Sequence, residues 1–139
     1  EDRIRLKFFG DTSVLPPRLQ ELIRRTDEIA ERLPGCFQAN VCVNYGGRDE
    51  ILRAARALAA SGGEWTEEAL SAHLDSRGIP DPDIIIRPGG ECRISNFLLW
   101  QGAYSELFFT DKLWPDFTEN DIDEILRSYA LRERRFGGI

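Results

Sequence analysis

The sequence predicts an α/β fold, in which a mostly parallel central sheet is flanked by helices. Strand-like and helix-like segments alternate along the chain, which is typical of parallel sheets. A short run of β-branched residues without polar interruption also indicates a strand that is covered on both faces. The four segments predicted as strands are residues 3–9, 37–45, 84–86 and 107–110.

In the first half of the chain, the spacing of apolar side chains separates strands from helices. Ile4, Leu6 and Phe8 alternate with basic residues, which predicts a strand with one buried face. Prolines open the helix that follows, where they are tolerated in the first turn, and a proline–glycine pair ends it. The second strand, residues 37–45, precedes a helix over residues 49–60.

The second half of the chain shows the same alternation. Thr66, followed by two glutamates, predicts the start of a short helix. Ser95 and Asn96 precede an apolar run and predict a helix over residues 97–104. A last helix is predicted over residues 121–136, where glycines end it.

Composition limits the classes of function that the chain can have. Its 139 residues fit one domain with a buried core, and 42% hydrophobic with 30% charged residues is typical of a globular protein. The formal net charge of −6 argues against a general nucleic-acid binder. Three cysteines without a CxxC pair predict free thiols in a reducing cytoplasm. No apolar run approaches the ~20 residues that span a bilayer.

The loop after the third strand is the strongest candidate site. It carries Arg87 and Arg93 around the sequence Pro88-Gly89-Gly90, and it leads to Ser95 at the predicted helix start. Two guanidinium groups can bind a diphosphate bidentately, and backbone N–H groups at a helix start suit the same anion. The alternative is that the arginines pair with Glu91 and other nearby acids.

Two further segments contain candidate ligand-binding residues. Glu106 stands at the start of a strand, and Mg²⁺ prefers one or two carboxylates together with phosphate oxygens. A purely structural carboxylate is the alternative at that position. The basic segment at residues 132–138 either complements the dipole of the last helix or folds over an anionic ligand, across a subunit interface.

Taken together, these stretches resemble the cis-prenyltransferases, the family of bacterial undecaprenyl diphosphate synthase and its relatives. The resemblance covers essentially all 139 residues. Its most specific part is residues 83–101, continued by Ala103-Tyr104 and Glu106-Leu107. The other matching stretches are Arg5-Leu6 through Gly10-Asp11, residues 44–51, Trp114-Pro115-Asp116-Phe117 and residues 132–138.

The resemblance implies an undecaprenyl diphosphate synthase-like fold and an enzyme of prenyl transfer. Such an enzyme condenses isopentenyl diphosphate with an allylic diphosphate to form a cis-polyprenyl diphosphate, with Mg²⁺. It also implies a cytoplasmic homodimer that binds no nucleic acid and contacts membranes peripherally through its lipid product. The substrate-binding residues that it implies are Arg87, Arg93, Ile94, Ser95 and Gly137, and the carboxylate linked to the metal is Glu106.

The resemblance implies a role for the C-terminal segment, and the second strand offers a candidate lining for the product tunnel. Gly137 belongs to an arginine–X–glycine segment, residues 135–137, which in the family reaches the site of the neighbouring subunit. The growing prenyl chain needs an apolar tunnel, and one face of the second strand is a candidate for its lining; ordinary sheet core is the alternative for the same face. The residues on that face are Phe37, Ala39, Val41 and Val43.

The chain also departs from the family pattern. The family begins with a segment containing a histidine–X–methionine–aspartate–glycine–asparagine motif, whose aspartate binds magnesium and the allylic diphosphate, and this motif has no counterpart here. We therefore expect residues 1–139 to be a single cis-prenyltransferase domain that lacks its N-terminal segment, holds only the isopentenyl diphosphate half-site and is inactive alone. The alternatives are a non-catalytic partner subunit of the same fold and a generic phosphate-binding α/β module.

Overall fold

The computed structural model describes residues 4–33 and 37–132. It divides into two compact units, Glu1–Ile79 and Pro80–Ile139, which we call unit 1 and unit 2 and describe separately. In the part of the chain that is described, no helix is both long and apolar enough to cross a bilayer.

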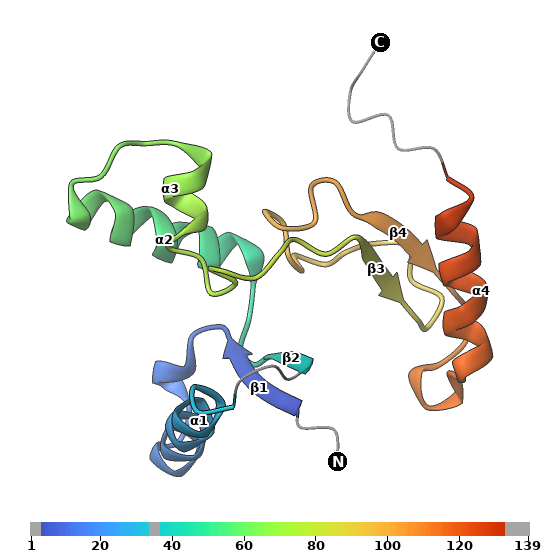
Figure 1. The fold of residues 1–139 in the computed structure, drawn as a ribbon, viewed down its shortest axis with the longest axis horizontal. Helices are drawn as coiled ribbons and strands as arrows, with labels where there is room; N and C mark the ends of the chain where they lie inside the picture. The colour runs from blue at the N-terminus through green and yellow to red at the C-terminus, as the bar shows by residue number, and fades with distance from the viewer. Residues whose placement is uncertain (1–3, 34–36, 133–139) are drawn as a thin grey trace. The chain divides into compact units, whose positions relative to one another are not determined.

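Unit 1 contains a pair of parallel strands (Figure 1). β1 (Ile4–Phe9) pairs with β2 (Phe37–Cys42) along their whole length, with Ile4 opposite Phe37. Because side chains alternate between the two faces of a strand, Ile4, Leu6 and Phe8 share one face with Phe37 and its alternate neighbours.

Helices connect and follow these strands. A short 3-10 turn (Thr12–Val14) leads into α1 (Pro17–Ala30), which packs on β1. Proline at the first helical position costs no hydrogen bond, because that N–H has no partner within a helix. α2 (Gly47–Ser61) begins shortly after β2, and α3 (Glu67–Ser71) packs against it.

The buried apolar side chains of unit 1 come from β1, α1, α2 and the turn after α3. Gly10 lets the end of β1 approach the end of β2 closely, since a Cβ at this position would lie 2.1 Å from the carbonyl oxygen of Val43. Its φ of +113° also favours glycine. The buried core residues are Phe9, Ala30, Ala54, Leu58 and Leu74.

Unit 2 contains a second parallel pair (Figure 1). β3 (Ile84–Arg87) pairs with β4 (Glu106–Phe109), with Ile84 opposite Glu106. The connection between the two strands, residues 88–105, consists of turns and irregular backbone.

A second 3-10 turn (Trp114–Asp116) leads to α4 (Glu119–Ala130). This helix begins with a capping box, in which Thr118 and Asp121 satisfy each other's backbone N–H groups. The acidic first turn, which also contains Glu119, suits the positive end of the helix dipole.

The structure confirms the α/β class and the parallel pairing of strands, but the predicted helix over residues 97–104 is wrong. Those residues form turns. Ser95, Asn96 and Leu98 have φ values of +48°, +64° and +44°, a left-handed backbone that cannot continue a right-handed helix.

Some predicted ends shift as well. The strand predicted over residues 37–45 stops at Cys42, and the helix predicted over residues 121–136 runs from Glu119 to Ala130. One central sheet of four strands, and a single domain over residues 1–139, stay predictions because the two units are described separately.

Candidate functional site

Arg87 ends β3, at the point where the chain enters the predicted anion-binding loop. Its side chain is partly exposed, and its carbonyl oxygen accepts a hydrogen bond of 3.1 Å from the N–H of Thr110. Within residues 4–33 and 37–132, no carboxylate forms an ion pair with its guanidinium group. Arg87 is therefore held at its backbone and available at its side chain, as an anion ligand must be.

The two glycines after Arg87 hold the loop against the chain after β4. Gly89 and Gly90 have φ values of +93° and +78°. Their N–H groups donate to the carbonyl oxygens of Lys112 and Thr110, both at 2.9 Å. The glycine N–H groups thus fix the loop to the segment after β4 and are not free to donate to an anion.

Arg93 forms an ion pair with Glu91, the alternative that the sequence left open. The two side chains are 65% and 46% exposed, respectively. Ion pairs in this environment contribute little to stability, so a multiply charged ligand can displace Glu91 at small cost. Ile94 is partly exposed, and its carbonyl oxygen accepts the N–H of Phe97 at 3.0 Å, which closes the turn behind Arg93.

Ser95 does not cap a helix, because no helix follows it. Its φ of +48° places it in the left-handed region, and its side chain is exposed. Gly102 explains part of this geometry, since a Cβ there would lie 2.8 Å from the carbonyl oxygen of Leu98 and 2.9 Å from Ile85 Cδ1. Gly102 therefore packs closely against Ile85 of β3, and Ser95, earlier in the same connection, is exposed.

Glu106, the expected metal-linked carboxylate, is the first residue of β4. Its N–H donates to the carbonyl oxygen of Asp83 at 2.9 Å, which fixes its backbone. Its carboxylate forms an ion pair with Arg132, whose guanidinium carbon lies 4.5 Å from the centre of the Phe108 ring. Sequence reasoning missed this partner, because nothing in the local spacing links residues that are 26 positions apart.

The donor set around Glu106 fits Mg²⁺ only in part. Among the described residues, no group of three or more histidine, cysteine, aspartate or glutamate side chains comes together. Mg²⁺ bound to a diphosphate needs only one or two protein carboxylates, so Glu106 fits as one ligand once Arg132 releases it. The remaining predicted residue, Gly137, lies outside the described residues, as does the rest of the arginine–X–glycine segment.

A buried polar network in unit 1 fixes the stretch that follows β2. Glu50 is 1% exposed and accepts hydrogen bonds from the Tyr45 hydroxyl at 2.5 Å and from the Asp75 N–H at 2.9 Å. Burial, and then the bond to Glu50, raise the pKa of Tyr45 far above its ordinary value. Asp75 in turn binds Arg53 through both carboxylate oxygens, at 3.0 and 2.8 Å, and accepts the Gly10 N–H at 2.8 Å.

Parallel strand pairs together with helices place the molecule in the α/β class, and comparison with known proteins defines it further. The family model described as "Putative undecaprenyl diphosphate synthase" matches residues 1–137. The chain therefore belongs to this prenyltransferase family.

Curated relatives and solved structures agree with this assignment. The chain is 45% identical over 146 residues to an isoprenyl transferase of Prochlorococcus marinus, covering 100% of this chain and 53% of that protein. It is 46% identical over 142 residues to the ditrans,polycis-undecaprenyl-diphosphate synthase ((2E,6E)-farnesyl-diphosphate specific) of Escherichia coli K12, covering 97% and 56% of the two chains.

Two solved structures superpose with TM-scores of 0.87. A probable undecaprenyl diphosphate synthase of Campylobacter jejuni is 36% identical, with 96% of this chain and 63% of that chain covered. The lavandulyl diphosphate synthase of Lavandula x intermedia, in complex with dimethylallyl diphosphate, is 39% identical, with 96% and 60% covered. The chain thus spans little more than half the length of the two curated relatives, and about three fifths of the two solved structures.

Proposed function

We propose that this chain carries the isopentenyl diphosphate half-site of a cis-prenyltransferase. The reaction condenses isopentenyl diphosphate with an allylic diphosphate and forms a cis-polyprenyl diphosphate. The observation that carries the proposal is that a member of this family presents Arg87, Arg93 and Ser95 along one loop after β3. Relatives named as undecaprenyl diphosphate synthases support the same reaction.

Each of these side chains has a separate task in holding the substrate. Arg87, whose backbone is fixed by Thr110, provides a rigid guanidinium at the end of β3. Arg93 exchanges Glu91 for the diphosphate, which offers more charge and more acceptor oxygens than one carboxylate. Ser95 donates its exposed hydroxyl to a phosphate oxygen, and the turn at Ile94 keeps the two side chains adjacent.

Glu106 is the proposed protein ligand for Mg²⁺. When bound, the metal would neutralise diphosphate charge and so stabilise the leaving group. In this proposal Arg132 keeps the carboxylate oriented before substrate arrives, since its position over Phe108 also fixes its own guanidinium.

The proposed assembly follows the family. It is a cytoplasmic homodimer in which Gly137 completes the site of the neighbouring subunit, and its lipid product brings it into peripheral contact with membranes. One face of β2 is proposed to line the tunnel for the growing prenyl chain. Phe37 and Val41, which are 78% and 40% exposed, support this because they leave apolar surface on that face.

An elongation assay tests the proposed reaction. Full-length protein is incubated with radiolabelled isopentenyl diphosphate, an allylic diphosphate and Mg²⁺, and the products are separated by chain length. We expect a cis-polyprenyl product that disappears when a chelator removes the metal, whereas residues 1–139 alone give none. Full-length protein that never incorporates the label, with or without a second subunit of the same fold, would contradict the proposal.

A further inference from the structure

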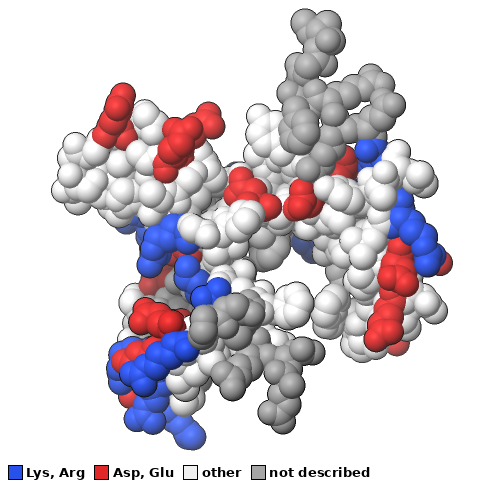
Figure 2. All heavy atoms as spheres, viewed as in Figure 1, with Lys and Arg blue, Asp and Glu red and all other residues white. Residues whose placement is uncertain are grey.

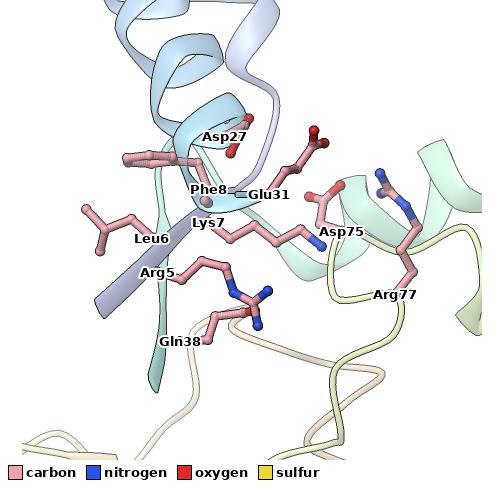
Figure 3. A pocket seen from close by; sticks show the side chains of 10 residues that line it. Arg5, Leu6, Lys7, Phe8, Asp27, Glu31, Gln38, Asp75 and Arg77 are labelled. Atoms are coloured by element: carbon pink, nitrogen blue, oxygen red, sulfur yellow. The ribbon is translucent and has the colours of Figure 1, made fainter. Parts of the chain in front are cut away.

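Unit 1 contains a cavity of about 390 Å³ that has no role in the proposed reaction. It lies against β1, beneath the C-terminal half of α1 and beside the segment that follows α3 (Figure 3). Three basic side chains line it, Arg5 and Lys7 from β1 and Arg77 from the later segment. The volume lies within the range of small-molecule sites in proteins.

The geometry of β1 brings two of these cations together. Arg5 and Lys7 are two positions apart on a strand, so they extend from the same face, opposite the apolar face formed by Leu6 and Phe8. Figure 3 shows both side chains extending toward the region where Asp75 and Arg77 lie.

None of the three cations has a carboxylate partner within ion-pairing distance among the described residues. The Nε of Arg5 is shielded from solvent and makes no hydrogen bond there. This contrasts with α1 and α4, where basic and acidic side chains lie side by side (Figure 2) and arginines such as Arg24 pair with glutamates. A sheltered, unpaired cation is costly and favours an added anion.

The charges around Lys7 also favour an added anion at this cavity. Burial lowers the pKa of Lys7, and Arg77 and Arg5 lower it further, while Asp27 and Asp75 act in the opposite direction. The positive charges crowd each other without contact to a counter-charge. A bound anion would relieve this repulsion.

Three carboxylates line the cavity, but none of them forms an ion pair with the three cations among the described residues. Asp75 is committed to Arg53 and to the Gly10 N–H. Asp27, from α1, and Glu31, which directly follows α1, make no such pair either. Their negative charge would repel an extended polyanion, which limits the ligand to one or two phosphoryl groups.

We propose that this cavity binds a small phosphate-type anion, inorganic phosphate or diphosphate, through Arg5, Lys7 and Arg77. Two guanidinium groups offer forked donors to phosphate oxygens, and the lysine adds a compact charge. The site uses none of the residues assigned to isopentenyl diphosphate, so it stands independently of the proposed reaction.

Calorimetric titration with inorganic diphosphate tests the site in full-length protein that carries Arg93→Ala, which weakens the proposed substrate loop. We expect Lys7→Gln and Arg77→Gln each to weaken diphosphate binding at least about tenfold, because each removes a charge-assisted contact. Asp27→Asn should tighten binding, because it removes a like charge from the cavity. Arg18→Gln, on the exposed side of α1, is the matched control and should change nothing.

Chemical-shift mapping of the unmutated protein tests the site even if a variant does not fold. Diphosphate should shift the backbone amides of residues 5–7 and 75–77. Unchanged affinity in both Lys7→Gln and Arg77→Gln, or no shift at these amides with millimolar diphosphate, would overturn the site. Failure of prenyl transfer would leave these readouts unaffected, so the two proposals are separable.

Discussion

Two charged clusters, the carboxylates Glu50 and Asp75 of unit 1 and the Glu91–Arg93 pair of unit 2, differ in how far they are buried. In unit 1, Glu50 is 1% exposed and Asp75 has only 17% of its side chain exposed, and both are bonded to partners far away in sequence. In unit 2, the pair between Glu91 and Arg93 is largely exposed and joins residues on a single loop. All five apolar residues that are buried in the described part of the chain belong to unit 1.

This difference separates charges that support the fold from charges that can meet a ligand. Removing a buried, fully bonded carboxylate is costly, because its hydrogen-bond donors lose their acceptor in a place that water does not reach. An exposed ion pair exchanges partners at little cost. We therefore expect substitutions of the buried carboxylates Glu50 and Asp75 in unit 1 to affect stability, and substitutions in the loop of unit 2 to affect substrate binding.

The largest loss of stability is expected from Glu50→Ala. It leaves the Tyr45 hydroxyl and the Asp75 N–H without their acceptor in a buried place, which should cost about 3 kcal/mol of unfolding free energy. Urea unfolding of the full-length protein measures the change. Glu50→Gln, which retains an acceptor oxygen, is the control and should lose clearly less; equal losses would mean that the hydrogen bonds are unimportant.

Asp75→Asn should have a smaller effect that depends on pH. Burial alone would raise the pKa of Asp75, but hydrogen bonds from Arg53 and Gly10 lower it below its ordinary value. Its charged form therefore stabilises the fold above the unfolded carboxyl pKa of about 3.9, and this contribution disappears as the pH falls through the lower folded pKa.

At neutral pH we expect Asp75→Asn to cost about 1–2 kcal/mol of unfolding free energy, as for a weakened bond to a charged group. Unfolding curves at a series of pH values should show the wild type and the variant converging below about pH 4. A difference that stays constant down to pH 2 would show that the charge of Asp75 has no part in it.

The smallest effect on stability is expected in unit 2. Glu91→Gln removes an ion pair whose members are largely exposed, so the unfolding free energy should change by less than about 0.5 kcal/mol. Thermal unfolding checks this value. A loss as large as that of Asp75→Asn would remove the contrast between the two units.

Local sequence signals predicted most of the fold. Alternating Ile4, Leu6 and Phe8 marked β1, and the β-branched run at residues 84–86 marked β3. The prediction of a helix over residues 97–104 is wrong, because Ser95 and Asn96 are residue types that often begin a helix but do not begin one here. Packing of Gly102 against β3 selects turns there, and such tertiary contacts are not visible in local spacing.

For the candidate site, the sequence indicated the residues and one nearby partner, but not the distant partners. Arg87 and Arg93 follow from the loop sequence, and Glu91 was one of two alternatives for the arginines, of which the structure shows the pair with Arg93. The contact between Glu106 and Arg132 is long-range, as is that between Arg53 and Asp75. The i,i+4 spacing of Asp49 and Arg53 is a local signal for one ion pair of Arg53, but it does not indicate Asp75.

The central claim is that the loop after β3 holds the diphosphate of isopentenyl diphosphate, and Arg93→Ala tests it most directly. The matched control is Arg127→Ala in α4, whose side chain is 74% exposed and lies 3.8 Å from Asp123. Steady-state kinetics of the two full-length variants give KM for isopentenyl diphosphate. We predict about a thirtyfold increase for Arg93→Ala, equivalent to ~2 kcal/mol, and none for Arg127→Ala. An unchanged KM in Arg93→Ala would contradict the claim.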